Sequence, residues 1–307
     1  MAGIFDFLGS IFGYVLWFFF DAVSNYTVAI LLFTVFINLL MFPIAIKRQK
    51  TMASNARMAE KQKELKKKYE KDMKKYNEEL AKLYEKEGIN PMSGCLSTMI
   101  LPLILWSGII GAINRPLQNT LHIPNEKISQ AVEILPTLPE VEGKITKGYE
   151  ELQIVRHFSE IKSHLTMFNK EELADIEEYS SGFDLMGVNL LKKPNDCAFN
   201  EMLWVIPVLC FVSSIAMMYI SQKMTGAQDQ MQGCMKFLPY GMFVFTSYIA
   251  YTIPGAVGIY WIFNSLIALL QNVILNKFYN TYTLNAKDEA ARYARLKLDE
   301  SANIDRK

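Results

Sequence analysis

The stretch NYTVAILLFTVFINLLMFPIAI, residues 25–46, is followed at once by a lysine-rich segment that begins KRQKTMASNARMAEKQKELKKK at residue 47. The first stretch carries no charge and is long enough, as a helix, to cross a hydrocarbon core of roughly 30 Å. The next segment, residues 47–90, holds 14 basic residues against 8 acidic ones, a net charge of +6. Because short positive segments stay on the cytoplasmic side, this junction predicts both a membrane span and its orientation.

Four further uncharged apolar stretches predict membrane helices, at residues 91–114, 202–221, 237–253 and 256–276. The predicted outer segment is residues 115–201. Residues 115–200 hold 14 acidic residues against 9 basic ones. The short loop at 222–236 and the tail at 277–307, with 7 basic and 5 acidic residues, fall on the inner side. The sequence therefore predicts an all-α integral membrane protein with five spans, its N-terminus outside and its C-terminus in the cytoplasm.

The first 24 residues form a separate apolar segment, with Asp6 and Asp21 as its acidic residues. It has neither a basic start nor a small-residue cleavage pattern, so it does not fit a secretory signal peptide. The apolar part is short for a membrane span. Two interpretations stay open: a helix that lies in the membrane interface, which we favour, or a sixth span. Both place residue 47 on the cytoplasmic side.

Residues 47–90 are rich in strong helix formers. An apolar stripe recurs along them at spacings of three and four, at Leu65, Tyr69, Met73, Tyr76, Leu80 and Leu83. A fold-back near residues 71–72 would bury more of this stripe than a single rod, so we expect a cytoplasmic helical hairpin. Most of its lysines solvate a helix face, but as a group they could contact anionic lipid heads or ribosomal RNA. The lysines in that group are Lys61, Lys66, Lys67, Lys68, Lys74 and Lys75.

Polar side chains recur at helical spacing inside the uncharged spans. They are Thr34 and Asn38 in the first span, Ser214 in the third, and Tyr260, Asn264 and Gln271 in the fifth. Hydroxyl groups commonly bond across contacts between membrane helices and contribute under about 1 kcal/mol each. The amides of Asn38, Asn264 and Gln271 need several partners or water. The pattern therefore favours a bundle with a wet, amide-lined interior.

The predicted spans contain neither histidine nor carboxylate, which argues against intramembrane catalysis and against an ion-coupled transporter. His157, Glu160 and His164 share a helix face at metal-like spacing, but a surface helix with two incidental histidines explains them better. The four cysteines fall on both sides of the membrane or inside it, so no disulfide pair and no metal-ligand spacing emerges. We expect no enzyme, no metal and no cofactor.

Five motifs resemble, in order, those of the YidC family of membrane protein insertases, which has relatives in mitochondria and chloroplasts. They are FINLLMFPIAIKRQK (36–50), LYEKEGINPMSGCL (83–96), FDLMGVNLLKKP (183–194), YISQKMTG (219–226) and IPGAVGIYWIFNSLIALLQN (253–272). They resemble the first core span running into its hairpin, the exit from that hairpin, the approach to the third span, the end of that span, and the fifth span. The resemblance covers residues 26 to about 278.

The resemblance implies a membrane insertase and chaperone of bacterial type in the cell membrane. Five helices would enclose a groove open to the cytoplasm and to lipid but closed toward the outside, with Asn38, Trp261 and Asn264 among its residues. The hydrophobic segment of a nascent membrane protein would slide along the apolar flank while its polar tail crosses through the groove, without nucleotide hydrolysis. The hairpin would receive the substrate or the ribosome. Membrane lipids and the Sec translocon are further expected partners, and DNA is not one.

One position departs from the family pattern. The residue four positions before the Phe-Pro pair is usually Arg or Lys in the family, and here it is Asn38. A buried cation about 8 Å from a substrate carboxylate would contribute on the order of 2 kcal/mol at an effective dielectric near 20. Attraction of acidic substrate tails is therefore weakened in this chain, whereas hydration of the groove is not.

Two other functions remain open on the residues alone. A membrane scaffold or receptor, with the hairpin binding one partner and the outer segment another, explains the loops but not the amide-lined spans. A small-solute transporter or pore is the third alternative. The outer segment is also longer than the family commonly shows, and the sequence gives it no role.

Overall fold

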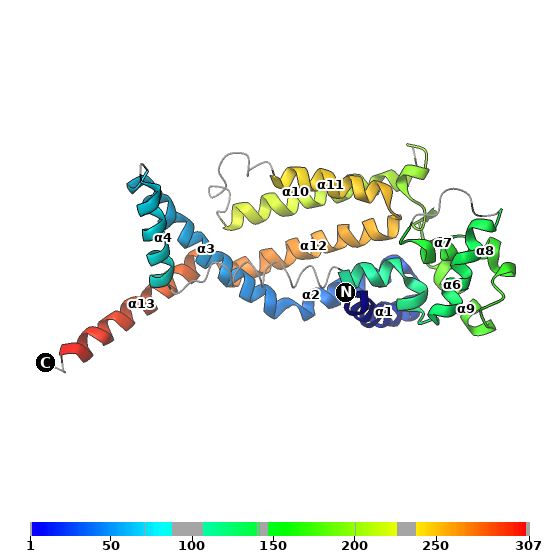
Figure 1. Cartoon of the computed structure of the whole chain (residues 1–307), viewed down its shortest axis with the longest axis horizontal. Helices are drawn as coiled ribbons and strands as arrows, with labels where there is room; N and C mark the ends of the chain where they lie inside the picture. The colour runs from blue at the N-terminus through cyan, green and yellow to red at the C-terminus, as the bar shows by residue number, and fades with distance from the viewer. Residues whose placement is uncertain are drawn as a thin grey trace. The chain divides into compact units, whose positions relative to one another are not determined.

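The computed structural model is mostly helical, with one two-stranded sheet (Figure 1). It describes residues 2–70, 72–87, 107–139, 141, 147–199, 201–225 and 238–304. The chain divides into two compact units. The first comprises Met1–Leu39, Ile100–Ile215 and Pro239–Ile267, and the second comprises Leu40–Met99, Ala216–Leu238 and Ala268–Lys307.

The apolar helices are α1 (Ala2–Val23), α2 (Tyr26–Leu40), α10 (Val205–Thr225), α11 (Leu238–Thr252) and α12 (Gly255–Phe278). Among the described residues, Met202–Ile220 and Gly255–Phe278 are each long and apolar enough to cross a membrane, and they match the third and fifth predicted spans. A third candidate is the bent pair Tyr26–Leu40 and Phe42–Thr51. Most of the predicted span 91–114 lies outside the described residues.

The structure adds detail to two predicted spans. The single helix expected over residues 25–46 is interrupted at Met41, where α2 ends and α3 (Phe42–Lys68) begins. Pro43 explains the break, because it has no N–H to donate and its ring clashes with the carbonyl of the residue four positions earlier. The helix in the predicted span 237–253 is α11, whose 15 residues give about 22 Å of helix, less than a hydrocarbon core.

The outer segment folds into short helices around its own core. Its elements are η1 (Pro116–Thr120), α6 (Asn125–Ile134), η2 (Leu135–Thr137), α7 (Glu150–Arg156), α8 (Phe158–Ile161), η3 (Lys162–His164), α9 (Lys170–Ser181), β1 (Asp184–Leu185), β2 (Val188–Asn189) and η4 (Pro194–Asp196). The short helix η5 (Met202–Trp204) follows it, at the start of the third predicted span. Strands β1 and β2 pair antiparallel. The helical stretch from Glu150 to Ile161 is broken at His157, which divides it into α7 and α8.

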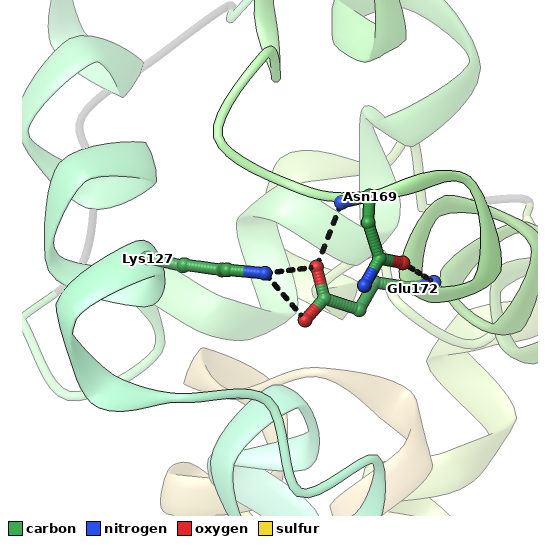
Figure 2. Close-up of polar contacts among 3 residues, drawn as sticks. All are labelled: Lys127, Asn169 and Glu172. Carbon is green, nitrogen blue, oxygen red and sulfur yellow. Dashed lines mark hydrogen bonds and ion pairs between the residues drawn. The ribbon is translucent and has the colours of Figure 1, made fainter.

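An ion pair fastens α6 to the start of α9 (Figure 2). The Lys127 ammonium donates to both Glu172 carboxylate oxygens at 2.8 Å. Glu172 is also the third residue of α9, where its side chain accepts from Asn169 N while Asn169 Oδ1 accepts from Glu172 N, a reciprocal capping box. One carboxylate therefore both caps a helix and joins it to another.

Helix α1 and the start of α2 pack against the outer segment through small and aromatic residues. A Cβ atom built on Gly13 would lie 1.9 Å from Asn119 O in η1, so only glycine allows this approach. At the other end, the rings of Tyr26 and Phe183 stack at 4.1 Å, and Tyr179 packs edge-on against both. Tyr26 N donates to Gly182 O at 2.9 Å. The outer segment is thus joined to the α1–α2 turn.

The second unit contains the hairpin and the C-terminal helix. Helix α3 and α4 (Met73–Glu87) meet across a turn at residues 69–72, as the predicted fold-back requires, and Gln62 Nε2 donates to the Tyr84 hydroxyl at 2.6 Å (Figure 1). Asp72 caps α4 by accepting from Lys75 N at 3.0 Å. Helix α13 (Thr281–Ile304) contacts α3.

Candidate functional site

The polar residues expected in the interior meet where α2 approaches α12. Thr34 is buried, and its hydroxyl donates to Ile30 O one turn earlier. One turn further on, Asn38 Nδ2 donates to Thr34 O at 2.9 Å and lies 3.5 Å from Asn264 Oδ1 on α12. The longer contact is at the upper limit of a hydrogen bond. Asn38 and Asn264, called the amide pair below, therefore bridge two helices and are both partly buried.

The remaining candidate residues lie on α12 and α10. Tyr260, one turn before Asn264, is 4% exposed, and Trp261 next to it is half-buried. Ser214 is half-buried on α10. Gln271 is half-buried seven residues beyond Asn264 and belongs to the second unit. The structure thus brings two of the three predicted amides into contact.

Helix α10 approaches α12 closely on the N-terminal side of Asn264. A Cβ atom on Gly258 would lie 2.4 Å from Ile206 Cγ2, far inside van der Waals contact. Next to this contact, the Cys210 thiol donates to Gly258 O at 3.4 Å. Glycine at position 258 therefore lets two helices approach until side chain meets backbone, as small residues do at membrane-helix interfaces.

Backbone hydrogen bonds join the outer segment to the same end of α12. The first orphan N–H groups of α12 are bonded by the outer segment: Gly255 N donates to Lys192 O at 3.0 Å and Ala256 N donates to Leu190 O at 2.9 Å. These two bonds satisfy buried donors and fix the segment across the beginning of α12. Lys192 and Leu190 lie in the FDLMGVNLLKKP motif, so this motif supplies the carbonyl groups that hold the beginning of α12.

Burial falls sharply along three helices at the level of the amide pair. In α2, six side chains between residues 26 and 37 are buried, and Asn38 and Leu39 are not. Every residue from 253 to 260 is buried, whereas none from 263 to 267 is. In α10 none of residues 211–215 is buried. The amide pair therefore lies at the boundary between a tightly packed end and a loosely packed end.

The residues through which α10 contacts α12 were not predicted as site residues. The polar pattern singled out Asn38 and Asn264, but Ile206, Cys210 and Gly258 are apolar or small and carry no chemical signal of their own. The usable signal was the spacing of Gly255 and Gly258 in an otherwise bulky span, since glycine costs helix stability and persists where a close approach requires it.

The hairpin lysines lie at and around the turn between α3 and α4. Five of the six are exposed and Lys61 is half-buried. Lys68 and Lys75 approach the Tyr69 ring from two helices, at 5.5 and 5.8 Å from its centroid. The predicted apolar stripe is half-buried except at Met73, which is 59% exposed. The turn thus presents a positive surface around one aromatic ring.

His157 of the outer segment contacts a carboxylate one turn away. His157 Nδ1 lies 2.8 Å from Glu160 Oε2, a contact within one turn. Across the described ranges, His, Cys, Asp and Glu side chains form no group of three that could hold a metal ion. The described cysteines, Cys197 and Cys210, are both free.

Comparison with known proteins places the chain. The model of the 60Kd inner membrane protein family matches residues 18–282. A membrane protein insertase YidC of Caldanaerobacter subterraneus subsp. tengcongensis is 30% identical over 252 residues, which are 82% of this chain and 85% of the relative. Insertases of the same name from Campylobacter jejuni and Rickettsia felis are 25% and 26% identical over 84% and 86% of this chain, but over only 35% and 38% of their own lengths. The chain therefore belongs to the 60Kd inner membrane protein family, that of the YidC membrane protein insertases.

Proposed function

We propose that this chain inserts nascent membrane proteins into the bilayer, using the loosely packed end of the bundle as a hydrated groove. The observation that carries the proposal is the abrupt loss of burial at the amide pair. The packed end, where Ile206 and Cys210 of α10 meet Gly258 of α12, is called the seal below. Polar groups just beyond this sealed end would keep a crossing polar tail hydrated, and each group so hydrated avoids a cost of several kcal/mol. The substrate's apolar segment enters lipid by hydrophobic transfer, so no nucleotide is consumed.

The arrangement in the membrane follows from the charge pattern. Five spans, at residues 25–46, 91–114, 202–221, 237–253 and 256–276, give an external N-terminus and a cytoplasmic C-terminus in a bacterial cell membrane. In this orientation the sealed end of α12 faces outward and the loosely packed end faces the cytoplasm. Because the groove is open on the cytoplasmic side, it would accept the polar tail of a nascent chain emerging from a ribosome.

Helix α1 would lie at the outer membrane interface. Its apolar part, Phe7–Val23, is shorter than a span. One face is buried against the protein, through Phe12, Leu16 and Phe20. The opposite face carries an exposed apolar stripe at spacings of three and four, Phe7, Ile11, Tyr14 and Phe18. A helix apolar on both faces needs lipid on the side that protein does not cover.

The hairpin is the proposed receiving element. The exposed lysines around the α3–α4 turn would meet anionic lipid heads, the ribosome or a Sec translocon, and the nascent chain would pass from there to the groove. The seal and the amide pair need no cofactor for this transfer.

The test is insertion into vesicles that contain only the purified protein. A one-span substrate is added, and protease protection of its translocated tail is measured. Asn38→Leu should reduce protection several-fold, because it removes the polar group at the inner edge of the seal, and Asn264→Leu should do the same. The double variant should lose little more, since the amides act as a pair. Phe36→Leu, at an exposed position of α2, is the control.

Charge at the same position separates a wet groove from a packed helix. Arg at the lipid-facing centre of a helix costs roughly 2.5–3.5 kcal/mol or more, but a hydrated groove would remove most of that cost. Asn38→Arg should therefore fold, insert substrate, and favour acidic tails over matched neutral ones. If Asn38→Arg unfolds while Asn38→Leu inserts normally, position 38 does not face a groove.

A further inference from the structure

The β1–β2 hairpin has a side chain at its tip that the protein itself does not use. The two-residue turn is Met186-Gly187, with φ values of 53° and 82°, and Asp184 Oδ1 accepts from Gly187 N at 2.7 Å. Turns with positive φ at both central residues favour Asn-Gly or Gly-Gly, because a bulky side chain is strained in the left-handed region. Met186 is nevertheless there, 85% exposed. A large apolar side chain in a strained and exposed position indicates an external contact.

The base of the hairpin is held level with the beginnings of two membrane helices. Before β1, Phe183 stacks on Tyr26, the first residue of α2, at 4.1 Å. After β2, Leu190 accepts a hydrogen bond from Ala256 N, in the first turn of α12. Leu190 N donates to Phe183 O and closes the base. Both flanks of the hairpin therefore lie where α2 and α12 begin.

The tip cannot lie far from that level. Two residue pairs and a turn extend roughly 10 Å from the base, and the polar headgroup region of a bilayer is about 5–8 Å thick on each side. A second exposed apolar side chain occurs in the same part of the chain. Phe199 is 82% exposed, and its ring packs at 5.0 Å on Trp204, which lies within the candidate span Met202–Ile220.

We propose that the β1–β2 hairpin is a membrane anchor of the outer segment, with Met186 inserted among the lipid head groups of the outer leaflet and Phe199 as a second lipid contact. The occupant is the lipid surface because both flanks are continuous with the membrane ends of α2 and α12. Trp204, whose ring centroid lies 4.9 Å from that of Tyr251 of α11, adds the aromatic layer typical of such an interface. The proposal depends on the spans and not on insertase activity.

The first test uses the unaltered protein. In lipid nanodiscs, the methionines are oxidised with a membrane-impermeant reagent and followed by peptide mass spectrometry. Met73, 59% exposed on the cytoplasmic hairpin, is the internal control. If only exposure in the protein mattered, Met186 would be oxidised faster than Met73, because its side chain is the more exposed. If Met186 is inserted in lipid, its oxidation should instead be several-fold slower than that of Met73. Oxidation of Met186 faster than that of Met73 would overturn the proposal.

The second test locates the tip directly. Spin labels are placed at Met186→Cys, at Ser163→Cys on the outer segment and at Val212→Cys on α10, in a variant without the four native cysteines. The label at 186 should show a higher ratio of oxygen to nickel-chelate accessibility than that at 163, approaching the value at 212. If the labels at 186 and 163 give the same ratio, the hairpin projects into water and the proposal fails.

Discussion

Gly258 shows how one missing side chain lets α10 approach α12 closely. A helical glycine replaced by alanine normally gains roughly 0.5–1 kcal/mol. At Gly258 the new Cβ would meet Ile206 at 2.4 Å, whereas a Cβ on Gly241 in α11 would meet nothing within 4 Å. Gly258→Ala should lower stability by about 1–3 kcal/mol through overpacking, and Gly241→Ala should preserve or raise it. Thermal unfolding of the two variants in detergent compares them. Equal behaviour would mean that α10 and α12 do not touch there.

Glu151 makes the stability of the outer segment depend on pH. It is 7% exposed on α7 and accepts from Gln118 N at 2.9 Å. Burial raises the pKa of this carboxyl to about 7, with the backbone N–H groups and Arg115 opposing the rise. Because the folded state holds the proton more tightly than the unfolded chain does, this contribution is fully present below the ordinary carboxyl pKa. It is lost as pH rises through 7.

The measurable consequence is a loss of stability between about pH 4.5, the ordinary pKa of this carboxyl, and pH 7, because only there does the folded state bind more protons than the unfolded chain. The full shift corresponds to on the order of 3 kcal/mol. Glu151→Gln stays neutral while keeping an acceptor oxygen for Gln118 N, so its unfolding temperature should change much less over that range. Glu171→Gln, on the exposed surface of α9, should behave like the original chain. A Glu151→Gln variant that retains the full pH dependence would show that another group titrates.

At the scale of elements, the α3–α4 hairpin should be separable from the membrane bundle. Deletion of residues 61–84 removes the α3–α4 turn and its lysines but none of the predicted spans. The truncated protein should remain folded in the membrane while insertion is abolished or strongly reduced. A variant with Lys66, Lys67 and Lys68 changed to Gln, which keeps the helices, distinguishes charge from shape. Unchanged insertion by the deletion variant in reconstituted vesicles would favour a scaffold function over an insertase.

Element type was predictable from the sequence wherever periodicity and composition agreed. The turn between α3 and α4 and the long helix α12 follow from an apolar stripe and an uncharged run, which are local properties. The break at Met41 was also available from Pro43 and was missed, because hydropathy alone does not register the lost N–H. The fold of the outer segment could not be predicted, since its core depends on contacts such as Tyr26 with Phe183 that join distant parts of the chain.

The site was predictable only in its polar half. Asn38 and Asn264 stand out in uncharged spans because an amide needs partners there. The seal of Ile206 and Gly258 depends on shape complementarity between two helices, which no single-residue property records. Gln271 shows the limit of spacing arguments: it shares the helical periodicity of Asn264 but belongs to the other compact unit.

At the scale of the whole molecule, the central claim is a groove closed outside and open to the cytoplasm, with the amide pair at its inner edge. The direct measurement is sided thiol labelling of Asn264→Cys in a variant without the four native cysteines, in membrane vesicles of both orientations. We predict that a membrane-impermeant reagent modifies position 264 from the cytoplasmic side and not from the outer side. Labelling from the outer side, or from neither side, would contradict the account.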